Sequence, residues 1–222
     1  MPALKPPLAE RTALAGPAGP LQALIETPQI EGGGTQVVTA FAVVCHPHPL
    51  YGGTMDNKVV YTLARTLEQL GAAAIRFNFR GVGSSAGQYD GGRGEKDDAL
   101  AVIAYGRQRW PGAQLWLAGF SFGAAVALHA AARGRAQRLI TVAPGITTVP
   151  VTDAEPPGCP WLIVQGDADE VVPPEAVRSW AQRLSPAPEL KMLPGAGHFF
   201  HGRLNELRDV VLAFMREAKA RS

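Results

Sequence analysis

The sequence predicts an α/β fold, in which a mostly parallel, twisted central sheet of about seven or eight strands carries helices on both faces. Three observations lead to this prediction. Short runs that are apolar almost throughout recur along the chain, which is typical of parallel strands covered on both faces. Amphipathic segments with helix-capping residues separate these runs. The 222 residues, 46% hydrophobic and 18% charged, suffice for a domain with a buried core.

Strands and helices alternate along the chain in the expected way. An antiparallel hairpin at about residues 10–27 forms one edge of the sheet. The predicted strands that follow are 41–46, 73–79, 115–120, 139–142, 161–165 and 190–193. The predicted helices are 56–70, 94–109, 122–133, 174–184 and 204–218. In such an arrangement, functional residues gather beyond the carboxyl ends of the strands.

Composition and charge favour a single domain over residues 1–222. The 21 Lys and Arg against 19 Asp and Glu give a net charge of +2, too small for a nucleic-acid-binding surface. No apolar run approaches the roughly 20 residues of a membrane helix. We therefore expect a cytoplasmic protein, a monomer or homodimer, that binds neither nucleic acid nor membrane. The two cysteines, Cys45 and Cys159, indicate no thiolate metal site, and we expect no metal and no cofactor.

The residues Gly-Phe-Ser-Phe-Gly at 119–123 form the most informative motif, because they join a predicted strand to a predicted helix. In a G-x-S-x-G turn the serine sits on a tight bend that exposes its hydroxyl above the sheet, and the flanking glycines avoid clashes. The helix that follows directs backbone N–H groups toward a developing oxyanion. Ser121 is therefore the predicted nucleophile, and the N–H of Phe122 is the first predicted oxyanion donor.

A serine nucleophile needs a base, and the base needs an acid to orient it. His198 follows the last predicted strand and a Pro-Gly-Ala-Gly loop, which places it at the carboxyl edge of the sheet. His129 lies about two turns along the helix after Ser121, and His201 lies near the start of the last helix. We therefore predict His198 as the base.

The acid should follow the strand before that of the base, in the run GDADEVVP at residues 166–173. Asp167 is nearest to the strand, where an Asp often caps a turn, and Glu170 also competes. Asp169 lies further into the loop, from which its carboxylate can turn back toward His198. We predict Asp169 as the orienting acid.

The order of these three residues, the nucleophile turn, and the strings GDADEVVP and GAGHFF resemble the α/β-hydrolase superfamily. The resemblance is to its small lidless members, near the dienelactone-hydrolase-like serine hydrolases, and it covers about residues 10–218. It implies Asp169 rather than Asp167 as the acid. Dienelactone hydrolases carry a cysteine where this chain has Ser121, so their substrate is not implied.

Two further strings suggest a narrower bacterial subgroup: CHPHPLYGGTMDNK at 45–58 and RFNFRGVGSS at 76–85. The loop of the first string should supply the second oxyanion donor. Its prolines have no N–H, which leaves His48, Leu50 and Tyr51 as candidates, and we favour Leu50. The two histidines of this loop have no Cys or carboxylate at ligand spacing, so we expect them to scaffold the loop rather than bind a metal.

The connection between the predicted strands 139–142 and 161–165 is short and rich in proline, so we expect no cap over the site. An open pocket with Tyr51, Ile146 and Phe199 as walls would suit small acyl groups. We therefore predict a serine hydrolase, a carboxylesterase or thioesterase that cleaves a small carboxylic ester or thioester through an acyl-enzyme. The alternatives are a peptidase or amidase with the same triad, and a non-catalytic binding protein that retains the fold.

Overall fold

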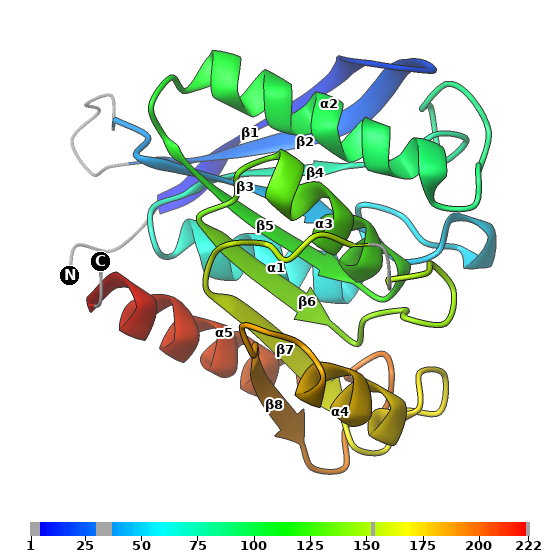
Figure 1. The fold of residues 1–222 in the computed structure, drawn as a ribbon. Coiled ribbons are helices and arrows are strands. Elements are labelled where there is room, and N and C mark those ends of the chain that lie inside the picture. The colour runs from blue at the N-terminus through cyan, green and yellow to red at the C-terminus, as the bar shows by residue number, and fades with distance from the viewer. Residues whose placement is uncertain (1–4, 30–36, 152–153, 221–222) are drawn as a thin grey trace.

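Eight strands form one sheet in the computed structural model, which describes residues 5–29, 37–151 and 154–220 (Figure 1). Their order in space is β1-β2-β4-β3-β5-β6-β7-β8. The pairs β1–β2 and β2–β4 are antiparallel, and every pair from β4 to β8 is parallel. The strands are β1 (Lys5–Gly16), β2 (Gly19–Gln29), β3 (Ala40–Cys45), β4 (Ala73–Phe77), β5 (Gln114–Phe120), β6 (Arg138–Val142), β7 (Trp161–Gly166) and β8 (Glu189–Leu193).

The helices cover both faces of this sheet, as Figure 1 shows. One face carries α2, α3 and α4, and the other carries α1 and α5. The helices are α1 (Lys58–Glu68), α2 (Arg93–Arg109), α3 (Phe122–Arg133), α4 (Pro174–Gln182) and α5 (Leu204–Ala220), with a single 3-10 turn, η1 (Pro49–Tyr51), after β3 in the described chain. The predicted fold class is therefore confirmed.

The apolar composition of the central strands follows from this layering. All six residues of β3 are buried. Val43 and Cys45 belong to the core cluster under α2 and α3, whereas Ala42 and Val44 belong to the cluster under α1 and α5. Since successive side chains of a strand point to opposite faces, a strand covered on both sides must be apolar at every position.

Some element boundaries differ from the sequence prediction. Both strands of the hairpin extend beyond the predicted 10–27. The strand β4 ends two residues earlier than predicted: the Asn78 N–H still donates to the Gln22 carbonyl of β2, but the Phe79 N–H donates to the ring of His46 in the loop after β3. The helix α1 begins at Lys58, because the side chain of Asn57, not that of Asp56, accepts the first-turn N–H.

In the described parts of the connection between β6 and β7, no helix covers the carboxyl ends of the strands. In the described parts of this connection, residues 143–151 and 154–160, the chain forms only turns, bends and irregular backbone. The predicted absence of a cap therefore agrees with the arrangement of these residues. The carboxyl edge of the sheet is where the site is built.

Candidate active site

Ser121 occupies the turn between β5 and α3. Its backbone angles, φ 54° and ψ −118°, are rare for a residue with a side chain. The neighbouring glycines permit this turn: an added Cβ at Gly119 would lie 2.2 Å from the carbonyl oxygen of Gly123, and one at Gly123 would lie 2.3 Å from that of His46. The Ser121 N–H donates to the Val142 carbonyl at 2.9 Å, which anchors the turn to β6.

Three predicted residues from distant segments meet at this turn. His198 Nε2 lies 3.1 Å from Ser121 Oγ, and His198 Nδ1 lies 2.9 Å from Asp169 Oδ2. His198 and Asp169 are buried, and Ser121 is half-buried. The imidazole packs against the ring of Phe120, with centroids 5.0 Å apart. A hydroxyl within hydrogen-bond reach of an imidazole, itself held by a carboxylate, can act as an activated nucleophile.

The carboxylate of Asp169 is held in an ionised, fixed position. Its Oδ1 accepts the N–H groups of Val171 and Val172, both at 2.8 Å, and its Oδ2 accepts from Gln165 Nε2 at 2.9 Å. Burial alone would raise the pKa of Asp169, but the hydrogen bonds from His198, Val172 and Val171 outweigh it and hold the pKa below its usual value. The carboxylate can therefore accept the Nδ1–H of the imidazole.

The competing acids of the same loop have other contacts. Asp167 Oδ1 accepts the N–H of Gly195 at 2.6 Å. Glu170 Oε2 accepts the backbone N–H of His198 at 3.2 Å. Both therefore shape the two loops that carry the buried pair, whereas Asp169 alone of the three contacts the imidazole of His198.

The competing histidines lie away from the hydroxyl of Ser121. His129 Nε2 lies 2.7 Å from the Pro150 carbonyl. His201 is exposed and packs against the ring of Phe199, with centroids 5.8 Å apart. The structure therefore brings His198, and neither of these, to the nucleophile turn.

The predicted oxyanion donors differ in whether their N–H groups are already used. The Leu50 N–H donates to Nδ1 of His48 at 3.2 Å, and the Tyr51 N–H donates to the His48 carbonyl at 3.1 Å. The N–H groups of His48 and Phe122, by contrast, have no acceptor among the described residues. This pattern argues against our preference for Leu50.

His46 fixes the peptide that carries the His48 N–H. The ring is fully buried, and burial lowers its pKa to about 4, so it is neutral at ordinary pH. Its Nε2 lies 3.0 Å from the Phe79 N–H and must accept from it, so Nδ1 carries the proton and donates to the Pro47 carbonyl at 2.6 Å. The two ends of a trans peptide point in opposite directions, so this bond also sets the direction of the His48 N–H.

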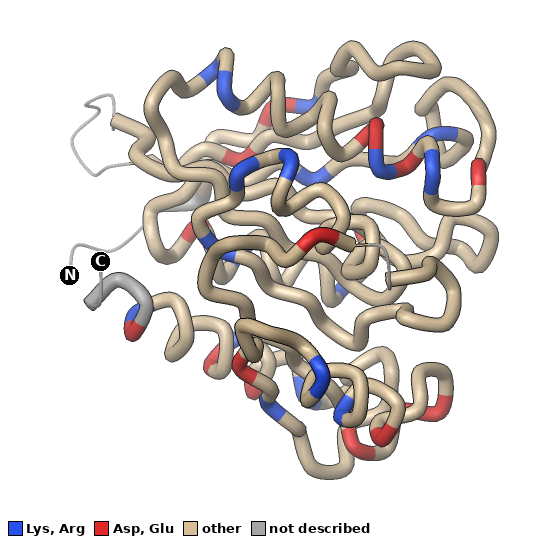
Figure 2. Tube along the Cα trace, in the orientation of Figure 1, with Lys and Arg blue, Asp and Glu red and all other residues tan. Residues whose placement is uncertain are grey.

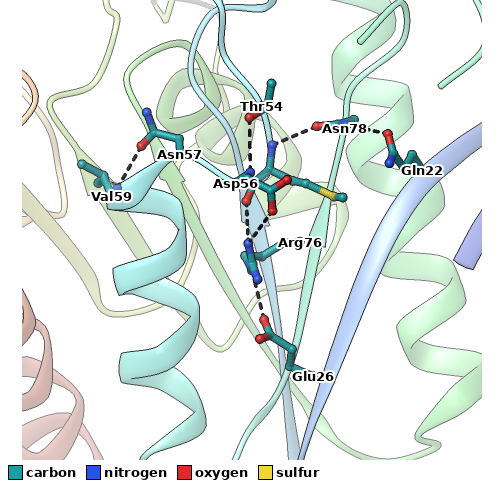
Figure 3. A network of polar contacts seen from close by, with 9 residues as sticks. Gln22, Glu26, Thr54, Asp56, Asn57, Val59, Arg76 and Asn78 are labelled. Carbon is teal, nitrogen blue, oxygen red and sulfur yellow. Dashed lines mark hydrogen bonds and ion pairs between the residues drawn. The ribbon is translucent and has the colours of Figure 1, made fainter. Parts of the chain in front are cut away.

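A network of polar side chains holds the far end of the same loop (Figure 3). The Met55 N–H donates to Asn78 Oδ1, and the Met55 carbonyl accepts from Arg76 Nη1, both at 2.8 Å. Asn78 Nδ2 in turn donates to Gln22 Oε1 at 2.8 Å, and Arg76 Nε donates to Glu26 Oε2 at 3.0 Å. The loop is thus tied at both ends to β4 or the two residues that follow it, and through them to the hairpin.

Sequence reasoning missed three of these supporting residues. Arg76 and Asn78 appeared only as part of a family string, although a charged and an amide side chain within an apolar strand signal a buried polar network. Gln165 is the second-to-last residue of β7 and is also buried. The same signal, a polar residue at the end of an apolar run, could have identified it.

The predicted pocket walls lie around the turn but differ in exposure. Tyr51 is 85% exposed and packs on the ring of His48, with centroids 4.6 Å apart. Phe199 is 43% exposed and meets the ring of His198 edge-on. Ile146 is half-buried and follows Gly145, whose N–H donates to the Ser121 carbonyl at 3.0 Å. All three therefore remain candidates for substrate contact.

The described residues contain no group of three or more His, Cys, Asp or Glu side chains arranged to hold a metal ion. Burial raises the pKa of the Cys159 thiol to about 11 and that of Cys45 further still, so both are protonated thiols.

Charges of both signs are interspersed along the chain (Figure 2). Within the described ranges, no helix has the length and apolar character to cross a bilayer.

Comparison with known proteins identifies the family. A model of the α/β hydrolase fold matches residues 48–158. The uncharacterized protein RP471 of Rickettsia prowazekii (strain Madrid E) is 38% identical over 180 residues, which make up 77% of this chain and 76% of the relative. The chain belongs to the α/β-hydrolase family. The resemblance seen in the sequence is thereby confirmed.

Two solved structures are similar to this α/β hydrolase over most of its length. XC6422 from Xanthomonas campestris, an α/β serine hydrolase without a lid, is 44% identical, with 97% of each chain covered and a TM-score of 0.89. An α/β serine hydrolase homologue from Coxiella burnetii is 45% identical, with 92% of this chain and 96% of that chain covered and a TM-score of 0.85. The chain is thus a hydrolase of this fold without a cap.

Proposed function

We propose that this hydrolase cleaves a small carboxylic ester or thioester through an acyl-enzyme intermediate. The main support is the continuous line of groups from Ser121 Oγ through His198 to Asp169 Oδ2, with separations of 3.1 and 2.9 Å. In this proposal Ser121 is the nucleophile, His198 the base and Asp169 the orienting acid.

The proton positions follow from the contacts of Asp169. Its ionised carboxylate accepts the Nδ1–H of His198, so the lone pair of Nε2 faces the Ser121 hydroxyl. As Oγ attacks the carbonyl carbon of the substrate, its proton passes to Nε2. The imidazolium then protonates the departing alcohol or thiol, which leaves an acyl group on Ser121. A water molecule repeats these steps, releases the carboxylic acid and restores the hydroxyl.

For the oxyanion, we propose the N–H groups of Phe122 and His48 as the two donors. Both lack an acceptor among the described residues, and the first also opens the helix α3, whose dipole favours negative charge. Leu50, which the sequence favoured, is replaced in this proposal because its N–H already bonds to His48 Nδ1.

Labelling with a fluorophosphonate probe, followed by a screen of para-nitrophenyl esters and thioesters, tests the proposal. The wild-type protein should be labelled and active, whereas Ser121→Ala should lose labelling and about 10³-fold or more of its turnover. Ser84→Ala, a change at an exposed serine outside the site, serves as the matched control and should keep both.

Retained turnover in the Ser121→Ala variant would refute the assignment of the nucleophile. Hydrolysis of anilides and peptides but not of esters would instead indicate an amidase with the same residues. A wild-type protein that neither reacts with the probe nor cleaves any of these substrates would indicate the non-catalytic alternative.

A further inference from the structure

A groove of about 660 Å³ lies between the beginning of α2 and the loop after β6. This size is within the range of small-molecule sites. The residues that line it are Tyr89, Asp90, Gly91, Arg93, Lys96, His129, Val149 and Pro150. None of them belongs to the proposed catalytic line, so the groove is a separate surface that needs its own explanation.

The inner end of this groove adjoins the proposed oxyanion site. Tyr89 Oη lies 3.1 Å from His48 Nε2, and the rings of Tyr89 and Phe122 have centroids 5.8 Å apart. Val149 approaches the same wall, since an added Cβ at Gly92 would lie 3.1 Å from Val149 and 3.7 Å from the ring of Phe122. These contacts place one end of the groove beside two residues of the proposed oxyanion site.

The charged side chains that line the groove differ in whether they have an ion-pair partner. Asp90 accepts from Arg93 Nη2 at 3.0 Å and from the Gly94 N–H at 3.2 Å, so these two side chains largely neutralise each other. Lys96 is half-buried, and no carboxylate among the described residues lies within 4.0 Å of its ammonium. Within the described part of the chain, Lys96 is thus a positive charge of the groove without an ion-pair partner, and a half-buried ammonium is stabilised when an anion binds beside it.

The hydroxyl of Tyr89 adds a directed hydrogen-bond donor. Because the Leu50 N–H donates to Nδ1 of His48, the proton of the neutral ring is on Nε2 and is donated to Tyr89 Oη. The hydroxyl proton of Tyr89 is therefore available for another acceptor. Burial raises the pKa of Tyr89, which keeps this proton in place.

We propose that the groove binds an anionic group of the substrate, a carboxylate or phosphate carried by its acyl or alcohol part, through the Lys96 ammonium and the Tyr89 hydroxyl. This inference rests on the ester or thioester hydrolysis proposed above and specifies its substrate class. The catalytic line handles the ester carbonyl, and the groove selects the far end of the molecule by its charge.

Binding of small anions tests the groove without any hydrolysis. Glutarate and inorganic phosphate are titrated calorimetrically into the wild-type protein and into Lys96→Met and Lys96→Arg variants. We expect at least one anion to bind the wild type, Lys96→Met to weaken it about tenfold, and Lys96→Arg to retain it. Lys191→Met, which removes an exposed lysine on β8, controls for the loss of net charge. Absence of binding by both anions, or equal binding by Lys96→Met, would overturn the proposal.

Matched substrate pairs test the same groove during catalysis. The first pair is mono-para-nitrophenyl glutarate and its terminal carboxamide, and the second is the acetate ester of para-hydroxybenzoate and that of its carboxamide. In at least one pair we expect kcat/KM to favour the anion about tenfold, with Lys96→Met and Tyr89→Phe reducing that preference. The pair in which the anion is preferred shows whether the groove binds the acyl part or the alcohol part of the substrate.

A preference below twofold in both pairs would reject the groove as an anion site. If no ester or thioester is cleaved at all, the proposed hydrolysis fails, whereas the calorimetric result still decides whether the groove binds anions. The two proposals can therefore fail separately.

Discussion

The imidazole of His46 takes no part in the proposed proton transfer, yet it sets the direction of the His48 N–H. With Nε2 occupied by the Phe79 N–H and Nδ1–H directed at the Pro47 carbonyl, the ring cannot rotate without losing a buried hydrogen bond. A pKa of about 4 keeps this arrangement intact over the working range of a histidine base. His46 is therefore a positioning residue for the proposed oxyanion donor His48.

We expect His46→Leu to lower kcat about tenfold or more with little change in KM, because the oxyanion forms only after the substrate is bound. Steady-state kinetics on a short para-nitrophenyl ester measure this split. His201→Leu, a change at an exposed histidine, should leave both constants close to wild type. A rise in KM alone, with kcat unchanged, would contradict the role in positioning the oxyanion donor.

Asp169 and Asp167 provide a sharper comparison, because the two carboxylates are two residues apart. Asp169→Asn should lower kcat by on the order of 10³–10⁴-fold, since an amide facing Nδ1 favours the wrong tautomer of His198. Asp167→Asn, which affects only the hydrogen bond to Gly195, should cost less than about tenfold. Measuring kcat for both variants tests this prediction. Similar losses of kcat in the two variants would contradict the assignment of Asp169 as the acid.

Among the elements, β4 has a role beyond the sheet. Residues at and just after its carboxyl end hold the loop after β3 at two points: Phe79 at His46, and Arg76 with Asn78 at Met55. A loop held at both ends can carry a donor in a fixed direction, which is what an oxyanion site requires. The strand and the loop therefore function as one unit.

The side chain of Asn78 allows this unit to be tested. Asn78→Leu should lower kcat about tenfold, because the Met55 N–H loses its acceptor, whereas Asn78→Asp keeps an acceptor oxygen and should retain most of kcat. Gln22→Leu, which removes the outer contact of Asn78 and the acceptor of the Ser84 N–H but leaves the bond from Asn78 to Met55, is the matched control. Steady-state kinetics give kcat for each variant, and urea unfolding gives its stability. Equal kcat losses in the Leu and Asp variants would indicate a purely structural role.

The elements themselves were largely predictable, and the exceptions share a physical cause. Continuous apolar runs and capping residues located the strands and helices, because burial on both faces leaves a strong pattern. The end of β4 and the start of α1 were misplaced, because side-chain acceptors decide them: His46 accepts the Phe79 N–H, and Asn57 accepts the Val59 N–H. The first bond depends on a neighbour that is distant in sequence, and the second on a choice between adjacent capping residues.

For the whole molecule, the meeting of Ser121, Asp169 and His198 was predictable because parallel strands bring their carboxyl ends to one edge. The second oxyanion donor remains a proposal. The choice between His48 and Leu50 depends on which way one imidazole ring turns, and that depends on Tyr89, which is 41 residues from His48 in sequence. Strand order can be inferred from a pattern of apolar runs, whereas the hydrogen-bond partner of a single amide cannot.

The absence of a cap leads to a prediction about substrate length. With no helix over the described carboxyl edge and with Tyr51 and Phe199 exposed, a long acyl chain would remain in contact with water. We therefore expect para-nitrophenyl esters of two to four carbons to give kcat/KM values at least about tenfold above that of the twelve-carbon ester. The measurement is made below the micelle concentration of the long ester. A clear preference for twelve carbons would contradict the open site.

The stability of the whole fold should depend on pH through Glu68, which packs at the end of α1. Its side chain is buried, it pairs with Arg65, and its Oε1 has no partner among the described residues. Burial, with the nearby Glu26 carboxylate, raises the pKa of Glu68 from its usual 4.5 to about 7, and Arg65 and Arg76 only partly oppose this. The native state therefore binds a proton more tightly than the unfolded chain does.

Between pH 4.5 and 7 this difference makes stability fall as the pH rises, because the carboxyl of Glu68 stays protonated in the native state while it ionises in the unfolded chain. Glu68→Gln removes the titration. Relative to wild type, the variant should gain on the order of 1–2 kcal/mol of unfolding free energy at pH 8 compared with pH 5. Urea unfolding at the two pH values measures this difference, and other titrating groups largely cancel in it. A difference that is the same at both pH values would show that Glu68 does not titrate in the native protein.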